Sequence, residues 1–340
     1  MVSTLYILVL GGAGVQNSHV VRELVQGNHK VRILSRNVQK EEPRLLSTLP
    51  GVEVVQGDTY DEGVLVSALQ DIDAVFVNTN GFATGEKSEI YWGIRIYELA
   101  YWAGVKHFIY SGLPHVSKKS SFNPKYRVPF VDGKAKVVEY LKSQPTDKMN
   151  WSILESGPYV ENFLLNHLVP KLDEKTGEYV FRAFLGDKGS MALVSLVELG
   201  WFARYMFEHP EEFVGDLLSV GIQHVTGQMM ADAFVTVTGQ KARYEPLTKQ
   251  ELESSFTTVK MGTGHSPGYD DPTLVTWRQM FVPWWTIWHE SHGNTGLWTK
   301  DYERLDKIKP DRMKNIEEWM RSVDYKAGMK ARIVLKSDSN

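Results

Sequence analysis

Short apolar runs alternate with amphipathic helical patterns along the first 155 residues of the chain. The apolar runs have the length of a strand and lie at 5–10, 31–34, 52–56, 74–78, 107–111 and 151–155. Apolar positions at helical spacing lie between them, at 20–25, 91–102 and 134–142. This regular alternation predicts a doubly wound α/β fold, in which a parallel sheet is covered by helices on both faces.

The alternation becomes irregular after Gly157 and Pro158. We expect a strand at 215–220 and helices at 162–172, 194–208, 226–238 and 313–321. Thr226 is a typical N-cap for the third of these helices, and Gly239 is a typical stop. We therefore predict a first domain, a smaller mixed α/β lobe and a frayed tail, with boundaries at 1–156, 157–330 and 331–340.

Composition excludes several classes of function. The formal net charge is −3 and no dense Lys/Arg run occurs, so we expect no direct binding of nucleic acid or of an anionic membrane surface. The chain has no cysteine, which excludes disulfides, thiolate catalysis and Cys-ligated zinc. The N-terminal apolar run lacks a cationic flank and is interpreted as a buried strand, not a signal peptide. We expect the protein in the cytoplasm, with the nucleus as a second possible compartment.

A glycine-rich turn, GGAGVQN, follows the first predicted strand directly and opens the first predicted helix. Gly11 permits a tight turn, and Gly14 leaves room for the backbone to approach a diphosphate. The N–H groups at the start of the helix would then bind the phosphates. Asn17 stands where a third glycine is usual, so we expect either a shifted helix or an amide contact to phosphate. The pattern predicts a dinucleotide site, the alternative being a plain strand–helix turn.

Arg36 comes just after the second predicted strand, 22 residues beyond Gly14. An enzyme selective for NAD(H) would place an acidic residue in this region to bind the ribose hydroxyls. An arginine here can instead pair with the 2′-phosphate of NADP(H), and Lys40 would add charge. The alternative is an ordinary surface arginine. Asp58, after the third predicted strand, is expected near the adenine amino group, with Thr59 beside it.

Seven stretches of the chain resemble the NmrA-like branch of the atypical short-chain dehydrogenase/reductases. They are GGAGVQN, VRILSRN, VEVVQGDTYD, VFVNTNGF, KHFIYSGL, VDGKAKVVEYL and SILESGPYVENFL, in this order over residues 5 to 165. The family includes transcriptional regulators, an NADPH sensor and reductases. The resemblance implies an α/β Rossmann-type doubly wound parallel sheet with a smaller mixed α/β C-terminal lobe, and NADP(H) as cofactor.

The residues themselves and the resemblance together predict which positions of this sequence form the cofactor site. Those before the fifth strand are Gly11, Gly14, Val15, Gln16, Asn17, Arg36, Lys40, Asp58, Thr59, Asn78, Thr79 and Asn80. Those from the fifth strand onward are Ser111, Lys134, Tyr159, Asn162 and Phe163, and the last three belong to a loop expected beside the nicotinamide.

The usual catalytic motif of short-chain dehydrogenases, Tyr-x-x-x-Lys, is incomplete in this sequence. Lys134 is present, but Phe130 occupies the position of the tyrosine. A lysine beside a cationic nicotinamide can have a lowered pKa, so Lys134 is a candidate acid or base, the alternative being a solvated lysine. Tyr159 is the second candidate, and Tyr126 and His115 are further groups that would replace the missing phenol.

The C-terminal region contains an aromatic segment between Trp277 and Trp298. Such a segment can line a pocket for a flat apolar substrate, and lobe packing or a homodimer interface is the alternative. His289 and His292 form a His-x-x-His pattern without a third ligand at suitable spacing, so we predict no metal site.

Two functions fit the sequence. The first is an NADPH-dependent reductase or tailoring oxidoreductase that acts on a hydrophobic aromatic or polyketide-like small molecule, with Lys134 or a tyrosine delivering the proton. The second is a non-catalytic redox sensor, in which NADP(H) occupancy controls binding to a transcription factor or another protein. Phe130 favours the sensor because it removes the usual phenol.

Overall fold

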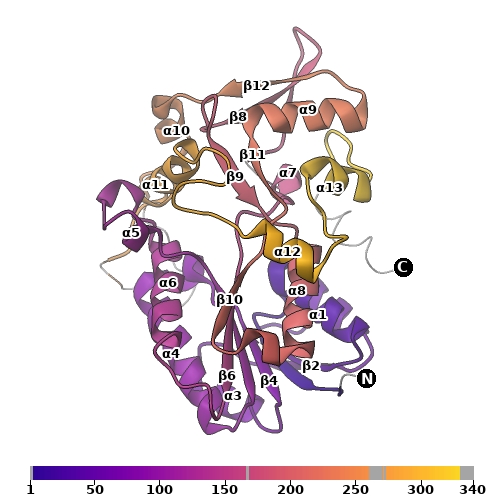
Figure 1. The fold of residues 1–340 in the computed structure, drawn as a ribbon, viewed down its shortest axis with the longest axis vertical. Coiled ribbons are helices and arrows are strands. Elements are labelled where there is room, and N and C mark those ends of the chain that lie inside the picture. Colours follow the sequence, from indigo (N-terminus) through magenta and orange to yellow (C-terminus); the bar gives the residue numbers. More distant parts are fainter. Residues whose placement is uncertain (1–2, 166–167, 260–270, 272, 330–340) are drawn as a thin grey trace.

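The computed structural model describes residues 3–165, 168–259, 271 and 273–329. Its centre is a sheet of seven parallel strands in the order β10-β6-β5-β4-β1-β2-β3 (Figure 1). The strands are β1 Tyr6–Leu10, β2 Lys30–Ser35, β3 Val52–Gln56, β4 Ala74–Val77, β5 His107–Gly112, β6 Asn150–Glu155 and β10 Asp216–Ser219. The order reverses between β1 and β4, which is the point where such sheets open a crevice at the carboxyl ends of their strands. The predicted doubly wound α/β class is confirmed.

Helices cover both faces of this sheet because its strands are apolar on both sides. Leu8 and Leu10 of β1 face one layer, which contains α3 Glu62–Ala68, α4 Gly81–Trp102 and α6 Pro129–Leu141. Ile7 and Val9 face the other layer, which contains α1 Val15–Gln26 and α8 Leu196–Glu208, with α2 Glu41–Leu46 at its edge. Figure 1 shows α4 beside α6 and α1 beside α8.

The sheet is not confined to residues 1–156. β10 pairs with β6 in parallel register, and α8 packs on α1 against the same sheet. Gly200 allows this approach, since a Cβ there would lie 2.8 Å from the carbonyl oxygen of His19. The chain therefore leaves the central sheet after β6 and returns to it at 196–219, with α8 and β10. A single domain boundary after residue 156 does not describe this path.

A smaller mixed α/β lobe lies beyond the carboxyl ends of the strands, in the upper half of Figure 1. It contains a three-stranded sheet in the order β12-β8-β7 and an antiparallel pair of β9 and β11. Its strands are β7 Lys171–Asp173, β8 Glu178–Ala183, β9 Ser190–Leu193, β11 Gln223–Thr226 and β12 Ala242–Pro246. Its helices include α9 Gly227–Thr238, α10 Lys249–Ser255, α11 Trp277–His289, α12 Tyr302–Ile308 and α13 Ile316–Ser322.

Within the described residues, four short helical segments connect these elements. They are α5 Val116–Lys119, α7 Asn162–Leu165, the 3₁₀ turn η1 Pro124–Tyr126 and the 3₁₀ turn η2 Pro210–Phe213. The predicted helix at 162–172 is wrong in length, since α7 ends at Leu165 and the chain becomes β7. Residues 171–173 pair with β8, so sheet pairing overrides the local helical pattern.

Other helices of this lobe follow the sequence more closely. α9 starts at the predicted N-cap Thr226, whose hydroxyl accepts from the N–H of Met229, and it ends at Gly239 with φ 70°. The aromatic segment, for which no helix was predicted, forms α11 with a capping box between Thr276 and Gln279. The predicted tail at 331–340 lies outside the described residues.

Candidate functional site

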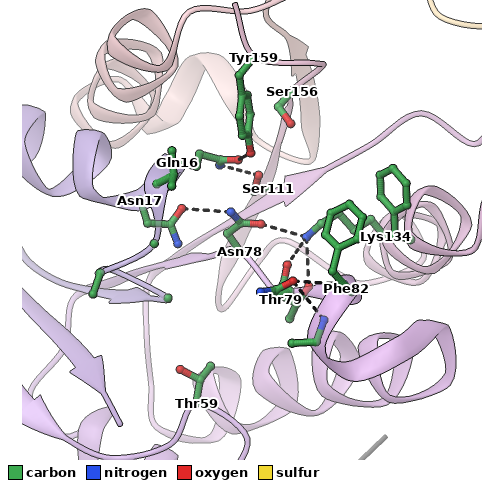
Figure 2. A pocket seen from close by; sticks show the side chains of 18 of the residues that line it. Gln16, Asn17, Thr59, Asn78, Thr79, Phe82, Ser111, Lys134, Ser156 and Tyr159 are labelled. Atoms are coloured by element: carbon green, nitrogen blue, oxygen red, sulfur yellow. Dashed lines mark hydrogen bonds between the residues drawn. The ribbon is translucent and has the colours of Figure 1, made fainter. Parts of the chain in front are cut away.

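A cleft of about 1350 Å³ lies at the carboxyl ends of the central strands, where the strand order reverses. All of the predicted cofactor residues except Phe163 line it. It begins at the glycine-rich turn, passes over the ends of β4 and β5, and reaches α11 of the smaller lobe. Figure 2 shows its floor, with the labelled polar side chains converging from several elements.

The glycine-rich turn forms one end of the cleft. Gly11 adopts φ +78°, which favours glycine, and its carbonyl accepts from the N–H of Gly14 at 2.8 Å. Gly14 is the N-cap of α1 and supplies no side chain to cap it. The first N–H groups of α1 therefore remain available to an anion in the cleft, which Val15 also lines.

The Asn17 side chain makes two hydrogen bonds within the protein. Its Nδ2 donates to the carbonyl oxygen of Leu10 at 2.7 Å, and its Oδ1 accepts from Asn78 Nδ2 at 3.2 Å. The side chain thus joins the ends of β1 and β4 beneath the turn. Close packing of the turn itself against β2 depends on Gly12, where a Cβ would overlap the Ile33 side chain.

Charged side chains gather at the β2 side of the cleft. Arg36 and Lys40 are exposed there, and neither forms a salt bridge with a described residue. Asp58 and Thr59 line the same part, and the Asp58 carboxylate accepts from the N–H of Tyr60 at 3.0 Å. The two cations are therefore positioned to bind an anionic group that enters from the turn.

A hydrogen-bonded chain crosses the floor from the turn to the loop after β6. The Tyr159 hydroxyl donates to Gln16 Oε1 at 2.9 Å, and Gln16 Nε2 donates to the Ser111 hydroxyl at 2.8 Å (Figure 2). Burial raises the pKa of the Tyr159 phenol, so this group stays protonated at neutral pH. Asn162, from α7, also lines the cleft.

Lys134 occupies the other side of the floor, on α6. Its Nζ donates to Asn78 Oδ1 at 3.0 Å and to the carbonyl and hydroxyl oxygens of Thr79 at 2.8 and 3.2 Å (Figure 2). Glu89 Oε1 lies 3.2 Å from the same nitrogen. Burial lowers the pKa of Lys134, and the neighbouring carboxylate opposes that shift. Lys134 is therefore a buried and hydrogen-bonded lysine and not a solvated surface one.

Asn80 begins α4, at the rim of the floor. Its side chain accepts from the N–H groups of Phe82 and Ala83, and its own N–H donates to the Tyr60 hydroxyl at 2.8 Å. The residue thus fixes the first turn of α4, which carries the exposed ring of Phe82 into the cleft.

An aromatic wall, defined as Phe82, Phe130, Phe281, Trp284 and Trp285, faces the floor. The rings of Phe82 and Phe130 are 4.5 Å apart, and Phe281 of α11 stacks on Phe82 at 6.1 Å. Leu113, Leu168, Met191 and Trp298 extend the apolar surface. Residues of the Trp-rich segment thus line the cleft, and α11 also packs in the smaller lobe's core, as the lobe-packing alternative expected.

The sequence model of the NmrA-like family matches residues 3–265. The chain belongs to the NmrA-like family. It is 29% identical over 255 residues to an NmrA-like family domain-containing protein of Dictyostelium discoideum, covering 74% of this chain and 83% of that one. It is 28% identical over 303 residues to the NmrA-like family domain-containing oxidoreductase lnaB of Aspergillus flavus, covering 81% and 89%.

The fold is shared with NmrA itself, a negative transcriptional regulator solved in complex with NADP. The two structures have a TM-score of 0.74 and 18% sequence identity, over 94% of this chain and 95% of that one. The NmrA-like fold expected from the seven motifs is thereby confirmed over both the central sheet and the smaller lobe.

Some predicted residues of this NmrA-like protein lie away from the cleft. Phe163 is fully buried in the smaller lobe against Phe181 and Trp319, because α7 turns its ring inward. Tyr126 donates to Glu290, and His115 accepts from the N–H of Lys118 at 3.2 Å. Neither of these last two lines the cleft, so the structure does not bring them to the floor.

The His-x-x-His pattern is split by the end of a helix. His289 is the last residue of α11 and stacks on Phe184, whereas His292 lies beyond the helix in a bridge to Gly189. The two rings therefore do not share a helix face.

No helix within the described ranges is long and apolar enough to cross a membrane.

Sequence reasoning missed two buried residues that support the floor from beneath, Glu89 and Tyr110. The Tyr110 hydroxyl lies 3.0 Å from Thr79 Oγ1, and the Thr79 hydroxyl donates to Glu89 Oε1 at 2.8 Å. A signal for Glu89 was present, since it precedes Trp92, Gly93 and Ile96 at spacings of three, four and seven. These are the buried positions of α4, so an acidic residue in this register is placed in the core.

Proposed function

We propose that this protein is an NADP(H)-dependent oxidoreductase acting on a hydrophobic aromatic or polyketide-like small molecule. The observation that carries the proposal is the continuity of the cleft. One cavity contains the glycine-rich turn, Arg36, Lys134 and the aromatic wall. Dinucleotide binding by itself requires the turn and the basic side, whereas an apolar chamber next to the polar floor is what a second molecule requires. The oxidoreductase name of the Aspergillus flavus relative supports the same assignment.

The residues present fit a bound NADP(H). Gly14 and the start of α1 would hold the diphosphate, since a side chain at residue 14 would crowd the Gly11 carbonyl, with its Cβ 3.1 Å away. Arg36 and Lys40 would hold the 2′-phosphate, and Asp58 would lie beside the adenine. Asn78, Thr79, Asn80 and Ser111 would then face the ribose and nicotinamide, with Lys134 and Tyr159 at the point where the substrate enters.

Proton transfer in such a site is best assigned to Lys134. Bound NADPH supplies a hydride to the substrate, and the protein must supply the accompanying proton. Burial raises the pKa of Tyr159 and lowers that of Lys134, so the lysine gives up its proton more readily near neutral pH. Tyr159 would donate a hydrogen bond that orients the substrate, through the hydroxyl that now contacts Gln16.

The aromatic wall supports an uncharged and flat substrate. No ionisable side chain belongs to it. The rings of its three phenylalanines lie 4.5 to 6.3 Å apart in tilted and stacked arrangements, and Trp284 meets Phe281 and Trp285 edge-on at 6.1 and 5.1 Å. Charged groups would lose hydration in this part of the cleft without gaining an ionic partner from the wall. A conjugated carbonyl compound or quinone satisfies both the wall and the proton donor.

The proposed selectivity for NADP(H) is tested by Arg36→Ala. We expect the affinity for NADPH to fall about tenfold or more, because a charge-assisted contact to phosphate is worth roughly 1.5–3 kcal/mol, while the affinity for NADH stays the same. Fluorescence titration with both cofactors measures this. Arg44→Ala is the control, since Arg44 is exposed on α2 and does not line the cleft. Equal affinities of the unaltered protein for NADPH and NADH would contradict the selectivity.

Turnover is tested by following NADPH oxidation with a panel of hydrophobic quinones and conjugated aromatic carbonyl compounds. The sensor function remains the second proposal, supported by Phe130 in the usual tyrosine position and by the shared fold with a regulator. It predicts no oxidation with any compound, together with a protein partner whose binding differs between the NADP⁺ and NADPH forms. Oxidation that is lost in Lys134→Met supports the enzyme.

A further inference from the structure

A carboxylate lies directly beneath the floor of the cleft and takes no part in the steps above. Glu89 of α4 has no exposed surface. Its Oε1 accepts from the Thr79 hydroxyl at 2.8 Å and lies 3.2 Å from Lys134 Nζ, whereas its Oε2 has no hydrogen-bond partner among the described residues. An isolated buried carboxylate is costly, so its position needs a partner that compensates for the lost hydration.

The start of α4 is built around this carboxylate. The helix contains a break at Gly85, whose φ of 77° and ψ of 164° separate the first turn from the rest. The first turn folds over Glu89, and a Cβ on Gly81 would overlap Oε2. Gly133 of α6 approaches from the other side, with the position of its Cβ 3.4 Å from the same oxygen. The local backbone thus seals Glu89 away from water.

The charges around Glu89 leave Lys134 as its counter-ion. Glu86, one turn earlier on α4, already pairs with Arg127 and Lys136 at 2.6 and 2.7 Å. The other titratable neighbours are the phenols of Tyr110 on β5 and Tyr60 after β3, whose pKa values are raised by burial.

Lys134 is connected in turn to the glycine-rich turn. Its ammonium donates to Asn78, and Asn78 donates to Asn17 below the turn. The position of the ammonium is therefore set by Asn78 and Thr79, which directly follow β4, and by the carboxylate of α4. The carboxylate also decides the net charge of the group that faces the cleft.

We propose that Glu89 is a positioning residue of the oxidoreductase site, which holds Lys134 at the cleft floor and cancels its charge. The proposal rests on the function proposed above. The Lys134–Glu89 pair then carries one proton and no net charge, so it does not repel the positively charged nicotinamide of NADP⁺. When Lys134 gives its proton to the substrate atom left with the electron pair after hydride transfer, a neutral amine beside a carboxylate remains. Water returns the proton.

The first experiment compares the affinities for NADP⁺ and NADPH in Glu89→Gln. At pH 6 the unbalanced ammonium should weaken the binding of NADP⁺ about tenfold more than the binding of NADPH, because only the oxidised ring is positively charged. At pH 9 Lys134 loses its proton, so the ratio of the two affinities should return to that of the unaltered protein. The unaltered protein should show a ratio independent of pH. Glu86→Gln is the control, on the same helix and outside the pair, and should leave the ratio unchanged.

An unchanged ratio in Glu89→Gln at both pH values would overturn the proposal. A protein that binds neither NADP⁺ nor NADPH would defeat the proposed function instead.

The Lys134–Glu89 pair is then tested by urea unfolding, which needs no cofactor. In Lys134→Met the uncompensated Glu89 must take up a proton on folding, so the unfolding equilibrium should shift towards the unfolded state by about tenfold or more between pH 5 and pH 8.

The double variant Lys134→Met with Glu89→Gln is the matched control for unfolding. It lacks both charges, so it should lose the additional pH dependence of Lys134→Met. An equal pH dependence in the single and double variants would show that Glu89 is not balanced by Lys134, and would overturn the pair. If Glu89→Gln alone does not fold, the comparison of these two variants still decides the question.

Discussion

At the scale of single residues, glycines determine how closely the backbone surrounds the site. Gly12 lets the turn lie against Ile33 of β2, and Gly81 leaves room for the carboxylate of Glu89. In both places the space that a methyl group would need is already occupied by a neighbouring side chain. Neither glycine is required by a left-handed backbone, in contrast to Gly11 and Gly85. Their role is therefore one of volume and not of conformation.

Gly81→Ala is predicted to destabilise the protein by roughly 1–3 kcal/mol, the usual cost of overpacking a filled interior. The new methyl group must displace the Glu89 carboxylate, so Lys134 should lose its counter-ion in the same variant. Urea unfolding gives the stability. Gly63→Ala is the control, because Gly63 lies in the first turn of α3 and a Cβ there meets only Asp61 Oδ1 at 3.4 Å. Equal stabilities of the two variants would contradict the volume argument.

At the scale of elements, local signals determined the helices that the chain could cap by itself. α9 starts and stops at the residues that the sequence indicated, because Thr226 and Gly239 act on their own neighbours. The expected helix at 162–172 failed because part of it pairs with β8. α11 was missed because Pro283 and clustered aromatics obscured a helix that its capping box and its packing in the core both stabilise.

Thr226→Ala should reduce the free energy of unfolding by about 1 kcal/mol, through loss of the cap that accepts from the Met229 N–H at 3.2 Å. The measurement is a denaturation curve. Thr236→Ala provides the comparison, since Thr236 is exposed within the same helix and alanine has the higher helix propensity. Destabilisation of the same size by both substitutions would mean that the cap contributes nothing of its own.

At the scale of the whole molecule, the chain crosses between its two parts more than once. α8 and β10 return to the sheet layer after the smaller lobe has begun, and Glu198 of α8 ties that layer to the C-terminal segment. Its Oε1 accepts from the N–H of Met313 at 2.6 Å, and Lys309 lies 4.0 Å away. Burial raises the pKa of Glu198 to about 7.

This shift makes a prediction for stability against pH. A carboxyl group whose pKa is higher in the folded state stabilises the fold while it is protonated, and that stability is lost as pH rises through the folded pKa. Glu198→Gln should therefore gain roughly 2–3 kcal/mol relative to the unaltered protein between pH 5 and pH 8. Unfolding curves at both pH values test it. A difference that stays constant with pH would show that Glu198 has an ordinary pKa.

The succession of strands along the chain up to β6, the glycine-rich turn and the basic residue after β2 followed from the sequence, because each depends on contiguous residues. Most of the predicted site residues share one cleft for the same reason, since the carboxyl ends of parallel strands meet at one edge. Phe163 failed because the direction of a ring on a four-residue helix is decided by what packs around it.

By itself, the sequence determined the α/β class, the family motifs and the position of the turn, since apolar period and glycine spacing are local properties. Only the tertiary structure decided that Asn17 joins two strands, that the aromatic segment lines the cleft, and that Glu89 lies beside Lys134. These are contacts between residues far apart in the chain. A buried charge is stable only where a partner, here distant in the sequence, compensates for its lost hydration.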